Sequence, residues 1–301
     1  MSVFTDLIEN EEKNKVVGGT LYLIATPIGN LADFSARALK TLAGVDFIAA
    51  EDTRTAQKLL SCFEIPPKEC ISYFEHNKRE KGAYIISRLL GGESCALLTD
   101  AGTPAISDPG EDIVRLCAES GVSVTAVPGC CAAVNALSLS ALSTRRFAFE
   151  GFLSANTGER RRHLDALRFE ERTLIFYEAP HKLRATLSDL YAAFGNRRIS
   201  LCREMTKLNE EIMRTTLEGA IRHYEENAPR GEYVLVIEGT DALSPELRPQ
   251  KKDEAWFASL SDEEHVAHYE AEGLSRMDAI KAAAKDLSIS KSELYRKLNL
   301  K

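Results

Sequence analysis

One stretch decides the fold: Leu97-Leu98-Thr99-Asp100-Ala101-Gly102-Thr103-Pro104-Ala105-Ile106-Ser107-Asp108-Pro109-Gly110. The apolar residues 95–98 predict a strand buried on both faces, and the residues that follow are typical of turns. Asp108 then suits the N-cap of a helix, with Pro109 at its first position. The loop therefore joins the carboxyl end of a strand to a helix N-terminus, where open α/β sheets bind anionic or carboxylate-bearing ligands. A tight strand-to-helix connection without a ligand would need the same residues, so this loop alone leaves both possibilities open.

The first half of the chain alternates predicted strands and helices. Strands are predicted at residues 20–25, 45–50, 70–74, 95–98 and 122–127, and helices at 34–42, 55–62, 78–90, 113–119 and 133–142. Five alternations predict an α/β domain over residues 20–145, with a parallel sheet and helices on both faces. Loops rich in Pro and Gly follow the first, fourth and fifth strands, so we expect one ligand to contact all three.

The pattern becomes less regular from Arg146 onward. Strands are predicted at 147–152, 173–177, 199–203 and 231–238, and helices at 158–169, 183–194 and 217–227. These elements predict a second α/β domain over residues 146–240. Polar residues follow its strands, so its strand ends supply titratable groups that the loops of the first domain lack.

The two ends of the chain differ in composition from its middle. Residues 1–19 predict a disordered tail without a signal peptide, and residues 241–252 predict a linker. Residues 253–301 predict a helical domain, with helices at 255–258, 262–272, 276–286 and 290–298. The last pair has the spacing of a helix-turn-helix, and Ser290 with Glu293 forms a capping box. Seven Lys and Arg stand against three acidic residues over 276–301, which suits contact with a phosphate backbone or an ordinary solvated basic face.

Composition excludes several classes of protein. The net charge of −7 argues against a surface that is basic throughout, so any contact with nucleic acid must use local patches. The seven cysteines form no C-x-x-C pair or zinc spacing, which indicates reduced cytoplasmic thiols. The uncharged residues 120–144 contain Pro128-Gly129 and predict a strand, a turn and a helix rather than a membrane span. Signatures of nicotinamide enzymes, P-loop ATPases, zinc proteases and serine hydrolases are absent.

Six segments, in order between residues 20 and 240, together resemble the tetrapyrrole-methylase superfamily and, within it, the ribosomal RNA small subunit methyltransferase I family. They are LIATPIGNL at 23–31, EDTR at 51–54, TDAGTPAISDPG at 99–110, VPG at 127–129, YEAPHK at 177–182 and REMTK at 203–207. The resemblance implies two α/β domains with a cofactor cleft between them. It also implies a homodimeric enzyme that uses S-adenosylmethionine to methylate the ribose 2′-hydroxyl of a cytidine in the decoding region of small-subunit ribosomal RNA. The partner would then be the 30S ribosomal subunit.

The resemblance also implies which residues contact the cofactor. They are Ile28, Gly29, Asp100, Gly102, Thr103, Ile106, Cys131, Ala132, Tyr177 and Glu232. Cys130-Cys131 departs from the family, whose members more often carry a small β-branched residue and a serine there. This departure removes a hydroxyl contact but leaves a backbone contact possible.

The reaction requires residues that align the ribose oxygen and help its proton leave, and it needs no metal. Candidate bases are Asp52, Glu178 and Glu204, and candidate cations that stabilise charge or hold phosphate are Arg54, Arg203 and Lys207. We rank Asp52, Arg54, Glu178 and Arg203 first because each stands at a predicted strand end facing the cleft. Each could instead serve as a helix cap or an ion-pair partner. Two other functions stay open: methylation of a small tetrapyrrole, and nucleic-acid binding without catalysis through residues 276–301.

Overall fold

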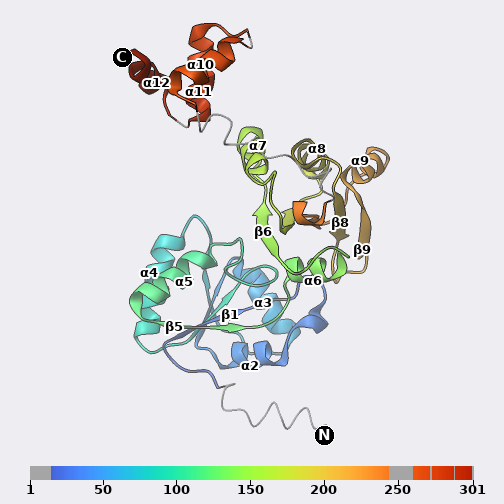
Figure 1. Ribbon diagram of the computed structural model, residues 1–301. Coiled ribbons are helices and arrows are strands. Elements are labelled where there is room, and N and C mark those ends of the chain that lie inside the picture. The colour runs from blue at the N-terminus through green and yellow to red at the C-terminus, as the bar shows by residue number, and fades with distance from the viewer. Residues whose placement is uncertain (1–14, 244–259, 272, 288, 300–301) are drawn as a thin grey trace. The chain divides into compact units, whose positions relative to one another are not determined.

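The computed structural model describes residues 15–243, 260–271, 273–287 and 289–299, which form two compact units with a boundary after Leu243 (Figure 1). Each unit is described by itself. Most of the predicted tail, most of the predicted linker and the predicted helix at 255–258 lie outside the described residues. Residues 15–19, at the end of the predicted tail, lie against the first sheet. Val17 N–H donates to the Tyr22 hydroxyl at 2.8 Å, and Gly19 N–H donates to the Glu93 carbonyl at 2.9 Å.

The first sheet is parallel throughout, as the alternating pattern predicted. Its strands are β1 (Thr20–Ile24), β2 (Phe47–Ala50), β3 (Glu69–Ser72), β4 (Cys95–Leu98) and β5 (Ser123–Val127), in the order β3-β2-β4-β1-β5. The residues of β2 and β4 are all buried, which explains their continuous apolar sequence.

Helices cover both faces of this sheet, as predicted (Figure 1). Helices α2 (Ala36–Gly44) and α3 (Thr53–Cys62) pack on one face, and α4 (Lys78–Leu90) and α5 (Gly110–Ser120) on the other. The Asp108 carboxylate accepts the Gly110 N–H at 2.6 Å, as expected of a cap. Helix α5 nevertheless begins at Gly110, one residue after the predicted first position, because the backbone turns first around Asp108 and Pro109.

The second sheet is mostly antiparallel. Its strands are β6 (Phe147–Phe152), β7 (Thr173–Glu178), β8 (Arg198–Arg203), β9 (Glu211–Thr216) and β10 (Tyr233–Ile237), in the order β6-β7-β10-β8-β9. Only β6 and β7 pair in parallel. The sequence did not predict β9, because this edge strand is partly exposed and lacks the apolar pattern of a buried one.

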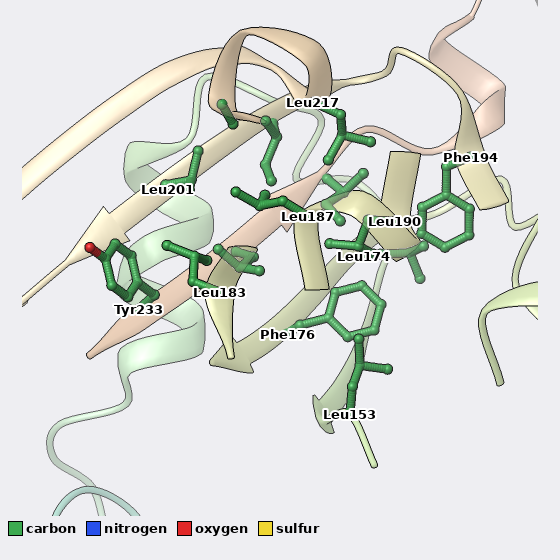
Figure 2. Close-up of a cluster of buried hydrophobic side chains, with 14 of the residues drawn as sticks. Leu153, Leu174, Phe176, Leu183, Leu187, Leu190, Phe194, Leu201, Leu217 and Tyr233 are labelled. Carbon is green, nitrogen blue, oxygen red and sulfur yellow. The ribbon is translucent and has the colours of Figure 1, made fainter. Parts of the chain in front are cut away.

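Two sets of helices cover the two faces of the second sheet. Helices α7 (Thr157–Ala166), α8 (Leu183–Phe194) and α9 (Leu217–Glu226) lie over one face. Figure 2 shows Leu183, Leu187 and Leu190 of α8 against Leu174 and Phe176 of β7. The opposite face is covered by α6 (Ala132–Leu139), which follows β5 of the first sheet. The helix predicted for the first domain therefore packs against the second sheet and fixes the two sheets together.

The second unit contains three helices in its described residues: α10 (Asp262–Ala271), α11 (Arg276–Asp286) and α12 (Lys291–Asn299). They enclose a small core that includes Val266, Ile280 and Leu294. The Glu293 N–H donates to Ser290 Oγ at 3.2 Å, which is one of the two bonds of the predicted capping box. Within the described parts of the chain, no helix has the length and apolar character needed to span a membrane.

Candidate active site

Hydrogen bonds join the loops after β1, β4 and β5 to one another. Thr26 N–H donates to the Gly102 carbonyl at 2.9 Å, and Gly102 N–H donates to the Thr26 carbonyl at 3.1 Å. Thr103 Oγ1 donates to the Cys130 carbonyl at 2.9 Å. The sequence predicted that these three loops converge, and these contacts confirm it. The three hydrogen-bonded loops together form one edge of the sheet, at the carboxyl ends of the parallel strands.

A cleft of about 500 Å³ lies between this edge and the second sheet. Ile28, Gly102 and Ile106 line it from the first sheet, and Phe152 and Met205 from the second. Its volume falls within the usual range of small-molecule sites, about 300–1,000 Å³. The cleft can therefore enclose one ligand of moderate size.

At the cleft, the second sheet presents the start of β10, which lies between the ends of β7 and β8. Tyr233, the first residue of β10, pairs in register with Glu178 at the end of β7 and with Arg203 at the end of β8. This arrangement places Tyr177 and Glu232 at the same edge, and both line the cleft.

Tyr177 ties the second sheet to the start of α6. Its hydroxyl accepts the Ala133 N–H at 3.1 Å, and its ring packs against Phe149 and Phe152 at centroid distances of 4.9 and 5.5 Å. Burial raises the pKa of Tyr177 to about 12, so the phenol is neutral at physiological pH. Tyr177 thus forms a rigid aromatic wall of the cleft.

Lys207, in the loop after β8, also lines the cleft. Its Nζ lies 2.8 Å from both Glu204 Oε1 and Glu232 Oε2, and the Glu232 N–H donates to Glu204 Oε1 at 2.9 Å. The hydrogen bond from Lys207, followed by that from the Glu232 backbone, lowers the pKa of Glu204. A Cβ placed on Gly29 would lie 2.3 Å from Lys207 Cγ, so the loop after β1 also needs a glycine to pack here. Glu204 is therefore held as an ion-pair partner rather than as a proton acceptor.

Backbone strain is concentrated in the loops that line the cleft. Six non-glycine residues in the described ranges have a positive φ, and four of them are Ala105, Ser107, Glu204 and Thr206. The first two belong to the loop after β4 and the other two to the loop after β8. Such conformations cost about 1–3 kcal/mol each and persist only where the surroundings enforce them, which is typical of ligand sites.

Nine of the ten residues that the family resemblance assigned to the cofactor line this cleft. They are Ile28, Asp100, Gly102, Thr103, Ile106, Cys131, Ala132, Tyr177 and Glu232. The tenth, Gly29, lines a smaller neighbouring pocket instead.

Two of the four residues ranked first for catalysis, Asp52 and Arg54, pair with each other outside the cleft. Asp52 is the N-cap of α3, with its Oδ1 2.8 Å from the Arg54 N–H and its Oδ2 2.7 Å from Arg54 Nη2. The side-chain and backbone hydrogen bonds from Arg54 lower the pKa of Asp52 to about 2. A carboxylate that holds a proton so weakly is a poor general base.

The other two candidates, Glu178 and Arg203, are also engaged. Glu178 lines the cleft but is only 3% exposed; its Oε1 accepts the Ala179 N–H at 2.8 Å and its Oε2 the Thr186 hydroxyl at 2.5 Å. Arg203 pairs at 2.8 Å with Glu211, its partner across β8 and β9, and does not line the cleft. Both side chains therefore hold the second sheet and its loops in place.

Glu51 lines the cleft, and the ranking of candidates missed it. It directly follows β2, whose last residue Ala50 is in register with Leu98 at the end of β4, so Glu51 comes close to Asp100. Partial desolvation in the cleft, followed by the charges of Asp100 and Asp108, raises the pKa of Glu51. Within the described residues no Lys, Arg or His lies within ion-pair distance of it. Its place as the first residue after a buried strand was the signal that could have identified it.

The comparisons with known proteins agree with this architecture. Residues 20–221 match the family model described as Tetrapyrrole (Corrin/Porphyrin) Methylases. The chain is 46% identical to a ribosomal RNA small subunit methyltransferase I from Halalkalibacterium halodurans, over 92% of this chain and 93% of that protein. It is 45% identical to the protein of the same name from Synechocystis, over 92% of this chain and 96% of that protein.

A solved structure of cobalt precorrin-4 methyltransferase, a cobalamin biosynthetic enzyme, has the same fold. The two structures superpose with a TM-score of 0.55 at 17% identity, over 73% of this chain and 95% of that one. At this identity the likeness concerns the fold alone. From the family model and the curated relatives, the chain belongs to the tetrapyrrole methylase family and, within it, to the ribosomal RNA small subunit methyltransferase I family.

Proposed function

We propose that this protein transfers a methyl group from S-adenosylmethionine to the ribose 2′-hydroxyl of a cytidine in the decoding region of small-subunit ribosomal RNA. The observation that carries the proposal is the cleft of about 500 Å³ between the three hydrogen-bonded loops and the second sheet. It occurs in a chain 46% identical to a protein named ribosomal RNA small subunit methyltransferase I.

The lining of the cleft fits S-adenosylmethionine. Ile28, Ile106 and Met205 offer apolar surface for a purine, and the backbone around Gly102 leaves room for close approach. Glu51 and Asp100 bring negative charge to a cleft that must hold a cationic ligand. When bound, S-adenosylmethionine supplies a methyl group made electrophilic by the attached sulfonium.

We assign the cofactor contacts to the nine predicted residues that line the cleft, and the role of proton acceptor to Glu51. Because partial desolvation and neighbouring carboxylates raise its pKa, the Glu51 carboxylate can accept the proton that the ribose hydroxyl releases. Glu178 and Tyr177 orient the surrounding loops, and Lys207 fixes Glu232 at the rim of the cleft. These residues align the reacting oxygen and limit the access of water.

The second unit is proposed to dock the substrate. Its helices α11 and α12 carry Lys and Arg at positions suited to a phosphate backbone. Deleting residues 244–301 should raise the KM for ribosomal subunits steeply and leave the affinity for the cofactor nearly unchanged. An unchanged KM would contradict this docking role.

Transfer of labelled methyl groups tests the proposal directly. The full chain is incubated with methyl-labelled S-adenosylmethionine and small ribosomal subunits prepared from cells that lack this enzyme. The labelled nucleotide is then mapped by nuclease digestion and mass spectrometry. We expect one labelled cytidine, modified on its ribose.

Two controls separate the alternatives. A porphyrinoid substrate is offered in place of the subunits, and calorimetry with S-adenosylmethionine measures cofactor binding. Label on the porphyrinoid alone would favour a tetrapyrrole methylase, and absence of cofactor binding would favour a protein that only binds nucleic acid.

Light scattering of the same sample tests the proposed homodimer.

A further inference from the structure

A second, smaller pocket of about 270 Å³ adjoins the cofactor cleft. It lies between the loop after β1 and helix α3, with Ala50, Ala56 and Leu59 among its apolar lining residues. Thr99 and Asp100 line both this pocket and the cleft. A group bound in the pocket would therefore meet a ligand of the cleft across these two residues.

Besides Thr26, Thr99 and Asp100, the polar side chains of the pocket come from the N-cap and the first two turns of α3. Asp52, Thr55 and Lys58 line it. The hydrogen bonds from Arg54 lower the pKa of Asp52 to about 2, so its carboxylate is ionised and can only accept hydrogen bonds at physiological pH. Asp52 Oδ2 receives one hydrogen bond, from Arg54 Nη2, and a carboxylate oxygen can accept two.

Glu51 and Asp52 are adjacent in sequence and line different spaces. Glu51 lines the cleft, whereas Asp52 lines the neighbouring pocket. A methyl donor in the cleft and an acceptor in the pocket would meet near Thr99 and Asp100, which line both spaces. The pocket would then hold the part of the acceptor that does not react.

We propose that this pocket binds the target nucleoside and that Asp52 selects cytidine by accepting a hydrogen bond from the exocyclic amino group of its base. The inference rests on the proposed function, since it requires a ribose acceptor. A carboxylate accepting from the amino group of cytosine is a known recognition pairing. Uracil presents a carbonyl oxygen at the same position, which an ionised carboxylate repels.

Size and surrounding charge fit this occupant. The pocket lies just below the usual range of small-molecule sites, so it suits one nucleoside and not a tetrapyrrole macrocycle. Arg54 and Lys58 are exposed on successive turns of α3, where they can contact the phosphates on either side of an inserted nucleotide.

Substitution of Asp52 tests the selection of the base. Small subunits are reassembled with ribosomal RNA that carries cytidine or uridine at the position mapped above, and kcat/KM is measured on both with full-length protein. We expect the unmodified protein to prefer cytidine by about ten-fold or more, and Asp52→Asn to reduce this preference to about three-fold or less. Asparagine is an equally good N-cap, so α3 should keep its start.

Thr55→Phe tests the pocket itself. Thr55 is exposed at the pocket wall, so a phenyl group there should block the pocket without disturbing the core. We expect kcat/KM for methyl transfer to fall about a hundred-fold while the cofactor affinity stays unchanged. Asp112→Asn is the matched control. It removes another carboxylate from the first turn of a helix. Asp112 pairs with Lys78 at 2.6 Å and with Arg115 at 2.5 Å and lines neither space.

Three results would overturn the inference. Asp52→Asn could keep the full preference for cytidine, Asp52→Asn could lose its cofactor affinity, or Thr55→Phe could leave kcat/KM unchanged. Failure of the unmodified protein to label any ribosomal RNA is a different result, because it would defeat the proposed function and the inference together.

Discussion

The two sheets of the first unit contribute to the cleft in different ways. The first sheet is parallel, so every strand ends at the same edge and the connecting loops meet there. The second sheet is mostly antiparallel, and the ends of β6, β7 and β8 and the start of β10 reach the cleft. The first sheet offers glycine and carboxylates such as Gly102, Glu51 and Asp100, and the second offers long side chains such as Tyr177 and Lys207.

The difference shows that polar side chains at strand ends do not all serve the same purpose. Glu178 and Arg203 stand at the ends of second-sheet strands, but their partners are within that sheet and its helices. Glu51 stands at the end of a first-sheet strand and faces the cleft with a raised pKa. We expect substitution of Glu51 to change activity, and substitution of Glu178 or Arg203 to change mainly stability.

Glu51→Gln should have the largest effect. Loss of a general base typically costs about 10²–10⁴-fold in rate, and cofactor affinity should change little. Because the pKa of Glu51 is raised above its ordinary value, kcat/KM of the unmodified protein should rise with pH through that elevated pKa. The carboxylate accepts a proton only when deprotonated, so Glu51→Gln should flatten this acidic limb. The exposed Glu119→Gln is the control, and an unaltered pH profile for Glu51→Gln would remove Glu51 from the mechanism.

Glu178→Ala should chiefly destabilise the second sheet. The truncation leaves the Ala179 N–H and the Thr186 hydroxyl without their acceptor, at a cost of about 2–3 kcal/mol in unfolding free energy. Denaturant titration measures the change, with the exposed Glu225→Ala as control. Normal stability with abolished methyl transfer would make Glu178 a catalytic residue and weaken the contrast between the two edges.

Gly102→Ala, in the loop after β4, and Gly121→Ala, at the end of α5, form a matched pair. Their φ values are +85° and +71°, so each substitution should cost about 1 kcal/mol of stability. Only Gly102 lines the cleft, and a Cβ there would lie 3.5 Å from Ile28 Cγ2, whereas a Cβ at Gly121 meets nothing within 4 Å. We expect a cofactor affinity lower by about ten-fold for Gly102→Ala alone. Equal affinities by calorimetry would show that the loop after β4 is not in contact with the cofactor.

Arg203→Gln should have the smallest effect. Its pair with Glu211 crosses two neighbouring strands at a partly exposed position, and such pairs contribute less than about 1 kcal/mol. We expect a slight fall in melting temperature and an unchanged kcat. A large fall in kcat at normal stability would place Arg203 among the substrate contacts instead.

Much of the first sheet could be predicted from the sequence. Strands such as β2 and β4 are short apolar runs bounded by turn residues, and burial on both faces requires that pattern. The second sheet was harder to predict. Its edge strand β9 is half-exposed and carries Glu211 and Arg214 among its six residues, so no periodic signal marks it.

The sequence by itself determined the order of strands and helices in the first sheet, the convergence of its Pro and Gly loops and the family. These follow from local properties, namely apolar runs, turn residues and short motifs. Only the tertiary structure decided that Glu51 lines the cleft, that Asp52 lines the neighbouring pocket, and that Glu178 and Arg203 are held by partners. The physical reason is that the surroundings of a carboxylate or a guanidinium come from residues far away in the chain, and those surroundings set its charge, its hydrogen bonds and its role.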